Sequence, residues 1–392
     1  MRAASRGKRP APDATVLLVY AIATLFNVGM MFLGLLVPLA LLRLHMQPAA
    51  LGLVVALPAA LLFALRWYAG RATDRFGARA VLVTGTTLFA CGALVLWRVP
   101  NLGGILAGQV LTGAGRAAFL PATQAQLYAG RDSASVARRA AAFNAAVGGG
   151  ATVGAILAGA IQGRGLAISA LVLLGVSATA VVAALLLPPR PARVAAAAAA
   201  PSGRLWRRLA PASLLAFISA LPFVLIGSFY PVYGHDLGMS GPALGIVDGL
   251  RGIALIGAGL SFSLLLTRLG RHRLALTSLL VMAAAIAATP WTVGILSLGA
   301  AVLAANIAGA WVFNEATLQV VDRARPDELG TAFAVSGTAW SLSLLLAPAV
   351  LGLVAQHLGV DATFWACAGA TGCTLALLSA ARPASGPGAA GA

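Results

Sequence analysis

Five charged side chains lie inside long apolar stretches of this sequence, and their chemistry is the first clue to function. Asp248 and Arg251 stand three residues apart, so on a helix the two side chains are near enough to pair. The others are Arg66, Arg116 and Glu315. A carboxyl group in apolar surroundings can load and release a proton near neutral pH. This pattern predicts proton coupling through Asp248, Glu315 or both, with Arg116 and Arg251 as gating partners.

Structural alternatives to proton coupling stay open for both carboxyl groups. Asp248 and Arg251 can form a salt bridge that neutralises itself and only stabilises the fold. Glu315 falls near the end of its apolar stretch, where its side chain can reach the water at the membrane surface.

The composition identifies the surroundings of these stretches as a lipid bilayer. Of 392 residues, 60% are hydrophobic and 9% are charged, against roughly 25% charged in an average soluble domain. The mean hydropathy is +0.92. These values exclude a cytosolic enzyme, a secreted module and a disordered regulator. The net charge of +17 would fit nucleic acid, but the basic residues fall mainly in short segments between apolar stretches, so no nucleic-acid partner is expected.

The apolar stretches predict an all-α integral membrane protein with twelve transmembrane helices, because a span needs about 20 apolar residues. The first stretch is too long for a signal peptide, so we expect a first span there. The twelve lie near residues 15–42, 48–69, 79–98, 102–126, 138–161, 166–187, 211–233, 242–266, 273–289, 292–318, 329–356 and 362–381.

A Pro- and Arg-rich segment divides the spans into two pseudo-symmetric six-helix bundles. The expected organisation is an N-terminal tail (1–14), an N-terminal half (15–187), a linker (188–210), a C-terminal half (211–381) and a C-terminal tail (382–392). Short segments in the two halves match at nearly constant spacing, with Arg75 and Gly77 corresponding to Arg268 and Gly270. Parallel repeats of this kind are typical of transporters.

The distribution of the 27 Lys and Arg residues predicts the orientation in the membrane. One set of loops, together with both tails and the linker, holds most of them, whereas the other loops hold Arg43, Arg98 and Arg164. Both termini and the linker are therefore expected to be cytoplasmic. We expect a multi-pass protein of a bacterial cytoplasmic (inner) membrane.

The loop after the second span carries a family resemblance. Its residues 70–79, GRATDRFGAR, resemble the GxxxDRxGRR signature of the major facilitator superfamily. The resemblance implies a gating loop that helps to lock the outward-open state, with Gly70, Asp74, Arg75, Gly77 and Arg79 as its matching residues. Gly70 is expected to permit close helix approach and Gly77 to permit the turn. A charged anchor loop is the alternative, but it does not explain this spacing.

Two further patterns bear on the type of transporter. Gly150, Gly154 and Gly159 are similar to the glycine motif of drug:proton antiporters in this superfamily, although Ala155 replaces its proline. A small-residue packing face is the alternative. In the fourth span the family pattern has an arginine at the position of Gln109, whereas here Arg116 follows about two turns later on nearly the same face. Arg116 can inherit that role.

The resemblance also implies that spans one, four, seven and ten line a central cavity. Its candidate polar and aromatic residues are Asn27, Gln109, Gln124, Phe223, Tyr230, Asn306, Trp311 and Asn314. Each of these residues, taken alone, also fits an interhelical hydrogen bond or an interface aromatic. A mainly apolar cavity suits amphipathic, drug-like substrates better than sugars.

Three functions follow, in order of preference. The first is secondary active transport, by proton-coupled export of small amphipathic molecules through alternating access, with protons and the small-molecule substrate as partners of a monomer. The second is import or facilitated transport of a small metabolite or organic anion attracted by Arg116 and Arg251. The third is a non-transporting receptor or assembly factor. No enzyme motif, cofactor motif or metal-ligand cluster is present in the sequence, so neither catalysis nor a cofactor is expected.

Overall fold

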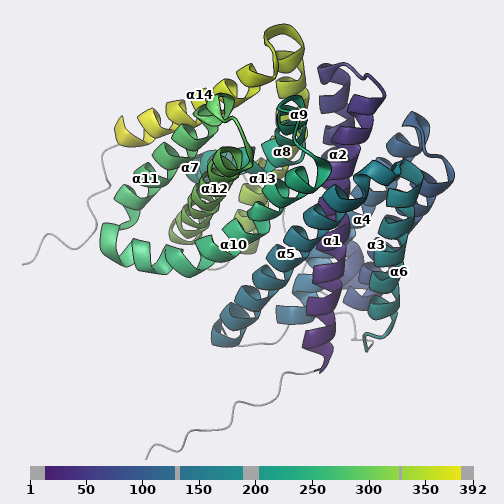
Figure 1. Cartoon of the computed structure of the whole chain (residues 1–392). Coiled ribbons are helices and arrows are strands. Elements are labelled where there is room, and N and C mark those ends of the chain that lie inside the picture. The colour runs from purple at the N-terminus through teal and green to yellow at the C-terminus, as the bar shows by residue number, and fades with distance from the viewer. Residues whose placement is uncertain (1–13, 129–132, 189–202, 326–328, 381–392) are drawn as a thin grey trace, which may run out of the picture.

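The computed structural model describes residues 14–128, 133–188, 203–325 and 329–380, and throughout these ranges the chain is helical (Figure 1). The expected all-α class is confirmed for this part of the chain. Nearly all of the predicted tails and most of the predicted linker lie outside the described residues.

The first group of helices, here called the N-terminal group, contains α1 to α6. Their bounds are α1 Ala14–Arg43, α2 Pro48–Phe76, α3 Ala78–Arg98, α4 Leu102–Tyr128, α5 Ser133–Ile161 and α6 Leu166–Leu185, with a short 3-10 turn at Gln162–Arg164. Their buried faces form one apolar core, in which Phe32, Phe89 and Leu173 are among the most deeply buried side chains.

The second group, here called the C-terminal group, contains α7 to α14. Their bounds are α7 Gly203–Ser219, α8 Leu221–Ile226, α9 Phe229–Asp236, α10 Gly241–Leu269, α11 Arg271–Ala287, α12 Ile295–Arg323, α13 Leu329–Leu358 and α14 Val360–Ala380, with a 3-10 turn at Thr289–Trp291. A second apolar core joins them. Helix α7 begins at Gly203, inside the segment predicted as a linker.

The seventh predicted span is a broken helix. The segment Gly203–Asp236 is interrupted between α7 and α8, just before Pro222, and again between α8 and α9 at Gly227 and Ser228. Proline cannot donate the backbone hydrogen bond that would continue the helix, which explains the first break. Counted with this segment as one, the described chain has twelve long helices.

Ten of these helical segments are long and apolar enough to span a membrane. The prediction of twelve spans is thus confirmed by length and composition for ten. The other two are α11, which has 17 residues, and α4, in which Gly, Gln, Thr and Arg116 dilute the apolar residues.

Two equivalent turns mark one end of the molecule, here called the arginine-rich end. A single glycine joins α2 to α3 and α10 to α11, and both glycines have positive φ, 84° at Gly77 and 73° at Gly270. Only glycine adopts this backbone conformation at low cost. Arg75 and Arg79 flank the first turn, and Arg268 and Arg271 flank the second. The turn expected at Gly77 is confirmed.

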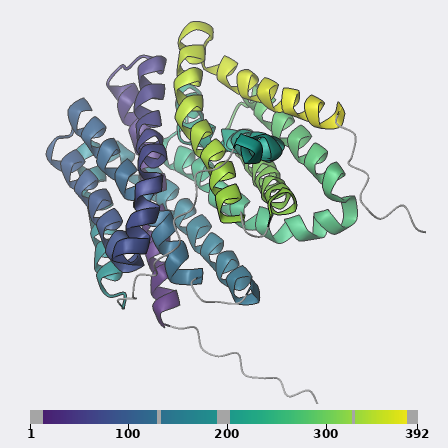
Figure 2. The same cartoon turned by 180° about the vertical axis from the view of Figure 1, so that it is seen from behind.

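The two groups lie side by side and touch mainly through two helix pairs, α5 with α10 and α2 with α13 (Figures 1 and 2). Near the end opposite the arginine-rich end, these contacts are backbone to backbone. A Cβ atom at Gly52 of α2 would collide with the carbonyl oxygen of Pro348 of α13. A Cβ atom at Gly245 of α10 would lie 2.6 Å from the carbonyl oxygen of Ala155 of α5. Small residues permit such close packing in membranes, and here they close this end of the interface.

Candidate functional site

A central cavity lies between the two groups, with a volume of about 80 Å³. Six stretches line most of it: residues 30–38 of α1, 55–59 of α2, 109–116 of α4, 223–227 in and after α8, 248–251 of α10 and 344–348 of α13. Most lining residues are apolar, and the charged ones are Arg116, Asp248 and Arg251. The cavity therefore combines an apolar wall with a few convergent charges, as ligand sites do.

Asp248 is the buried acid of this cavity. Its residue is 4% exposed, and its Oδ2 atom has no hydrogen-bond partner among the described residues. An unpartnered carboxylate oxygen in apolar surroundings is unfavourable, so it marks a place where a proton or a ligand would be stabilised.

Arg251 does not form the salt bridge with Asp248 that the spacing allowed, since no ion pair within 4 Å joins them. Its guanidinium instead lies 3.5 Å from the ring centroid of Phe223, and its Nη1 atom is 2.7 Å from the Sδ atom of Met31. Phe223 belongs to the short helix α8, so the break in this segment turns an aromatic ring onto Arg251. A stacked arginine keeps its charge and its remaining donors available.

Arg116 and Gln109 face the same cavity from α4, two turns apart. Gln109 is buried, and its Nε2 atom donates to the carbonyl oxygen of Val54 at 3.4 Å. Arg251 experiences the charges of both Asp248 and Arg116. One carboxyl group and two guanidinium groups thus converge from helices of different groups.

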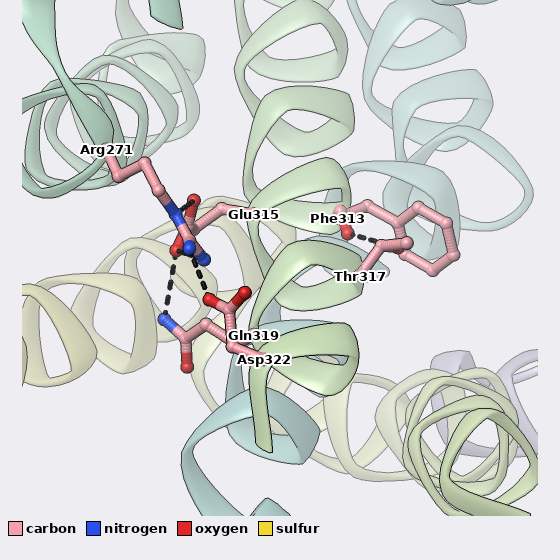
Figure 3. A network of polar contacts seen from close by, with 6 residues as sticks. All are labelled: Arg271, Phe313, Glu315, Thr317, Gln319 and Asp322. Atoms are coloured by element: carbon pink, nitrogen blue, oxygen red, sulfur yellow. Dashed lines mark hydrogen bonds and ion pairs between the residues drawn. The ribbon is translucent and has the colours of Figure 1, made fainter. Parts of the chain in front are cut away.

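Glu315 lies elsewhere, in a polar network between α11 and α12 near the arginine-rich end (Figure 3). Arg271 donates to both carboxylate oxygens, from Nη2 to Oε1 at 3.1 Å and from Nε to Oε2 at 3.4 Å. Gln319 donates to Oε1 at 3.2 Å, and Asp322 pairs with Nη1 of the same arginine. Burial lowers the pKa of Arg271, but the hydrogen bonds and charges of Glu315 and Asp322 outweigh it and raise this pKa above its ordinary value.

The predicted gating loop occupies the end of α2 and the start of α3. Arg79 donates from Nη2 to the carbonyl oxygen of Leu185, the last residue of α6, at 2.7 Å. Arg75 is exposed, and the side chain of Asp74 lies outside the described residues. A Cβ atom at Gly70 would have no described atom within 4 Å, so in this structure no described helix approaches closely there.

The glycine motif of α5 contacts two helices. A Cβ atom at Gly150 or Gly154 would collide with the backbone of α1, at the carbonyl oxygens of Thr24 and Val28. A Cβ atom at Gly159 would collide with α10, at Gly241 and Gly245. This motif therefore packs α5 within its own group and also against the other group.

The remaining residues predicted to line the cavity have other surroundings. Asn27 and Asn306 donate to carbonyl oxygens one turn earlier in their own helices, and Trp311 donates to Ser261. Tyr230 is buried against Phe364 in the core of the C-terminal group. Gln124 is exposed, and Asn314 is partly exposed. Of the eight candidates, Gln109 and Phe223 line the central cavity.

The sequence interpretation missed three features of the interface. Met31 lines the cavity, and so do the helix prolines Pro58 and Pro348. The two prolines could have been noticed in the sequence, because each lies inside a long apolar stretch. Arg66 of α2 donates across the groups to α13, to the carbonyl oxygen of Gly337 at 3.2 Å and to Ser341 Oγ at 2.9 Å. This contact joins the two groups on the side of the cavity nearer the arginine-rich end.

Comparison with known proteins identifies the family. A sequence model of the major facilitator superfamily matches residues 18–211 and again residues 212–391. The chain belongs to the major facilitator superfamily. It is therefore a membrane transporter of that type, and the two consecutive matches divide it close to the start of the predicted C-terminal half.

Solved structures of other transporters share the fold. A point mutant of the nucleoside transporter NupG gives a TM-score of 0.78 at 15% identity, covering 93% of this chain and 99% of NupG. A POT family transporter in complex with 5-aminolevulinic acid gives 0.76 at 12% identity, covering 93% and 95%. The human organic anion transporter MFSD10 gives 0.70 at 17% identity, covering 94% and 100%. No curated protein sequence matches.

Proposed function

We propose that this transporter is a proton-coupled secondary active transporter of small amphipathic molecules, working by alternating access, and that Asp248 carries the proton. The supporting observation is the buried, unpartnered Oδ2 atom of Asp248 in the cavity between the two groups. A carboxyl group at this place can exchange its proton with either side as the groups rock about the cavity.

Asp248 is preferred to Glu315 as the proton carrier because of their different partners. Glu315 is held by Arg271 and Gln319, and it lies outside the cavity. Charge-assisted hydrogen bonds are among the stronger polar contacts in proteins, and several of them hold this side chain in place. Glu315 is therefore assigned a structural role, in which it fixes the start of α11 against α12.

The proposed architecture has two six-helix halves, 15–187 and 211–381, with both termini and the arginine-rich end in the cytoplasm of a bacterium. The close glycine contacts at the opposite end then correspond to a closed external side. We propose that the gating loop from Gly70 to Arg79 helps to close the cytoplasmic side in the outward-open state, and that the glycine motif at Gly150, Gly154 and Gly159 supports closure of the external side. The transporter is proposed to act as a monomer.

A second candidate function is uptake of an organic anion, and the charges of the cavity favour it. Arg116 and Arg251 together outweigh the one carboxyl group of Asp248. Among the structural neighbours, one is named as an organic anion transporter. The glycine motif led us to expect export in exchange for protons. Such exchange requires a substrate that competes with the proton for binding, as a cation does and an anion does not.

The test of the proposal is proton movement in proteoliposomes that contain a pH-sensitive dye. Substrates are found by screening small amphipathic molecules for proton flux with the unaltered protein. Asp248→Asn should abolish substrate-induced proton flux but retain exchange of labelled substrate, whereas Glu315→Gln should retain both. Normal proton flux in Asp248→Asn would refute the assignment.

A further inference from the structure

None of the three charged residues of the central cavity forms an ion pair within 4 Å with another described residue. Asp248 Oδ2 accepts no hydrogen bond from the described residues, and Arg251 contacts a ring and a thioether sulfur rather than a carboxylate. Within the part of the chain that the structure describes, Arg116 has no hydrogen bond or ion pair. Asp248 is buried, and Arg116 and Arg251 are partly exposed at the cavity. Charges withdrawn from water are normally paired, so these three groups are suited to charges that a ligand brings.

The surrounding wall defines the rest of the ligand. Phe223 covers one face of Arg251, and Met30, Val55 and Phe89 add apolar surface. The neutral polar side chains are Gln109 and Thr112, and both already have backbone partners. An acid group with a compact apolar body matches such a site. The volume of about 80 Å³ is well below the roughly 300–1,000 Å³ typical of sites for drug-sized ligands, which favours a small molecule.

We infer that the substrate is a small organic acid whose acid group binds between Arg116 and Arg251, and that it binds together with a proton on Asp248. This inference rests on the proposed function and names its substrate class and the sense of its coupling. Arg116 belongs to the N-terminal group and Arg251 to the C-terminal group. An acid group bound to both guanidinium groups would hold the two halves together around the substrate.

Whether substrate and proton move together or in opposite directions follows from the charges of Asp248, Arg116 and Arg251. When Asp248 is ionised, it offsets one of the two arginines and repels an anion; when it is protonated, both positive charges are available. An anion and a proton therefore favour each other's binding, which is the thermodynamic basis of symport. A cationic substrate would instead compete with the proton for Asp248, and exchange would result.

Every charged group that faces Asp248 within the described residues enters this balance. Helix α10 contributes Arg251 and α4 contributes Arg116. The stretches of α1, α2, α3, α8 and α13 that line the cavity contribute no titratable residue. Helices α5, α9, α11 and α12, which pack on α10, contribute no residue to the lining, and Glu315 of α12 is paired with Arg271.

The experiment measures binding to the purified full chain, so it needs no proton gradient. The probes are short aliphatic and aromatic carboxylic acids, each with its matched amide and amine, and the readout is thermal stabilisation followed by titration calorimetry at pH 5.5 and pH 8. We expect acids to bind, amides and amines not to bind, and acid affinity to fall as the pH rises.

The variants locate the site. Arg116→Gln and Arg251→Gln should each weaken acid binding roughly ten- to hundredfold, because each removes charged hydrogen bonds to the ligand. Arg98→Gln, which removes an equal charge from an exposed position outside the cavity, should change nothing. Asp248→Asn should bind acids with similar affinity at both pH values. Arg251→Lys, which keeps the charge, should recover part of the affinity and so separates a binding effect from misfolding.

The outcomes that overturn the inference are distinct from failure of the proposed function. Amines that bind better than acids, no binding by any acid, or full acid affinity in both Gln variants would each refute the substrate class. Acid binding that is unaffected by pH would refute co-binding of the proton. If acids bind as expected but Asp248→Asn still moves protons in proteoliposomes, the substrate class stands and the proton carrier is another group.

Discussion

The network around Arg271 allows the role of Glu315 to be tested against a neighbour that shares the same partner. Glu315 and Asp322 both pair with Arg271, whose side chain is 40% exposed. The side chain of Glu315 is 6% exposed, whereas that of Asp322 is 54% exposed. The two acids therefore differ mainly in burial, and burial should decide how much each one stabilises the fold.

The expected free energies follow from this difference. Glu315→Gln preserves the shape but removes the charge of a buried acceptor that Arg271 and Gln319 share, and hydrogen bonds to charged groups are worth about 1.5–3 kcal/mol. Asp322→Asn weakens an exposed ion pair, which is worth about 0–1 kcal/mol. We therefore expect Glu315→Gln to lower the free energy of unfolding by more than Asp322→Asn does.

The assay is chemical denaturation in detergent micelles, followed by tryptophan fluorescence, with the double variant Glu315→Gln/Asp322→Asn completing a cycle. Because both acids share Arg271, the double variant should cost more than the sum of the single variants, since the arginine then loses both charged partners. An equal or larger effect of Asp322→Asn would refute the assignment of Glu315 as the buried anchor. Loss of proton coupling in Glu315→Gln would separately contradict its structural role.

Three further predictions concern the backbone and the interface between the groups. Gly77→Ala forces an alanine into a positive-φ conformation and should lower the free energy of unfolding by about 1–3 kcal/mol. Gly70→Ala adds a methyl group in open space on a helix and should be neutral or stabilising. Thermal unfolding of the two variants measures the difference. Gly245→Val inserts atoms against Ala155 and Gly159 and should destabilise the α5–α10 contact by about 1–3 kcal/mol. The opened contact should raise thiol labelling of a cysteine placed at Gly34, which lines the cavity. Gly257→Val, with no described atom within 4 Å of the added Cβ, should leave this labelling unchanged. Arg66→Met removes two donors between α2 and α13 and should raise the same labelling, whereas Arg98→Met should leave it unchanged.

Much of the fold could be predicted because its signals are local. Long apolar stretches give helices, and the glycine at residue 77 permits the tight turn that its neighbours require. The break in the seventh span was not predicted, although Pro222 marks it. Helix α4 is the converse case. Its polar residues lower its mean hydropathy below that of the ten candidate spans, although it is a full-length helix.

The candidate site was only partly predictable, because pairing depends on which helix faces meet. The spacing of Asp248 and Arg251 allowed a salt bridge, but Phe223 and Met31 hold the arginine instead. For Glu315 the sequence left open proton exchange or a place at the membrane surface, and it did not predict the contact with Arg271 at the start of another helix.

The sequence by itself determined that the protein is helical, lies in a membrane and carries a few buried charges, since composition and spacing along one helix set these properties. Only the tertiary structure decided which charges meet. Arg116 and Asp248 come from different groups of helices, and they share a cavity because glycine contacts bring α5 against α10 and α2 against α13. The same packing leaves Glu315 outside. Contacts between distant helices depend on the shapes of whole faces, which no local pattern encodes.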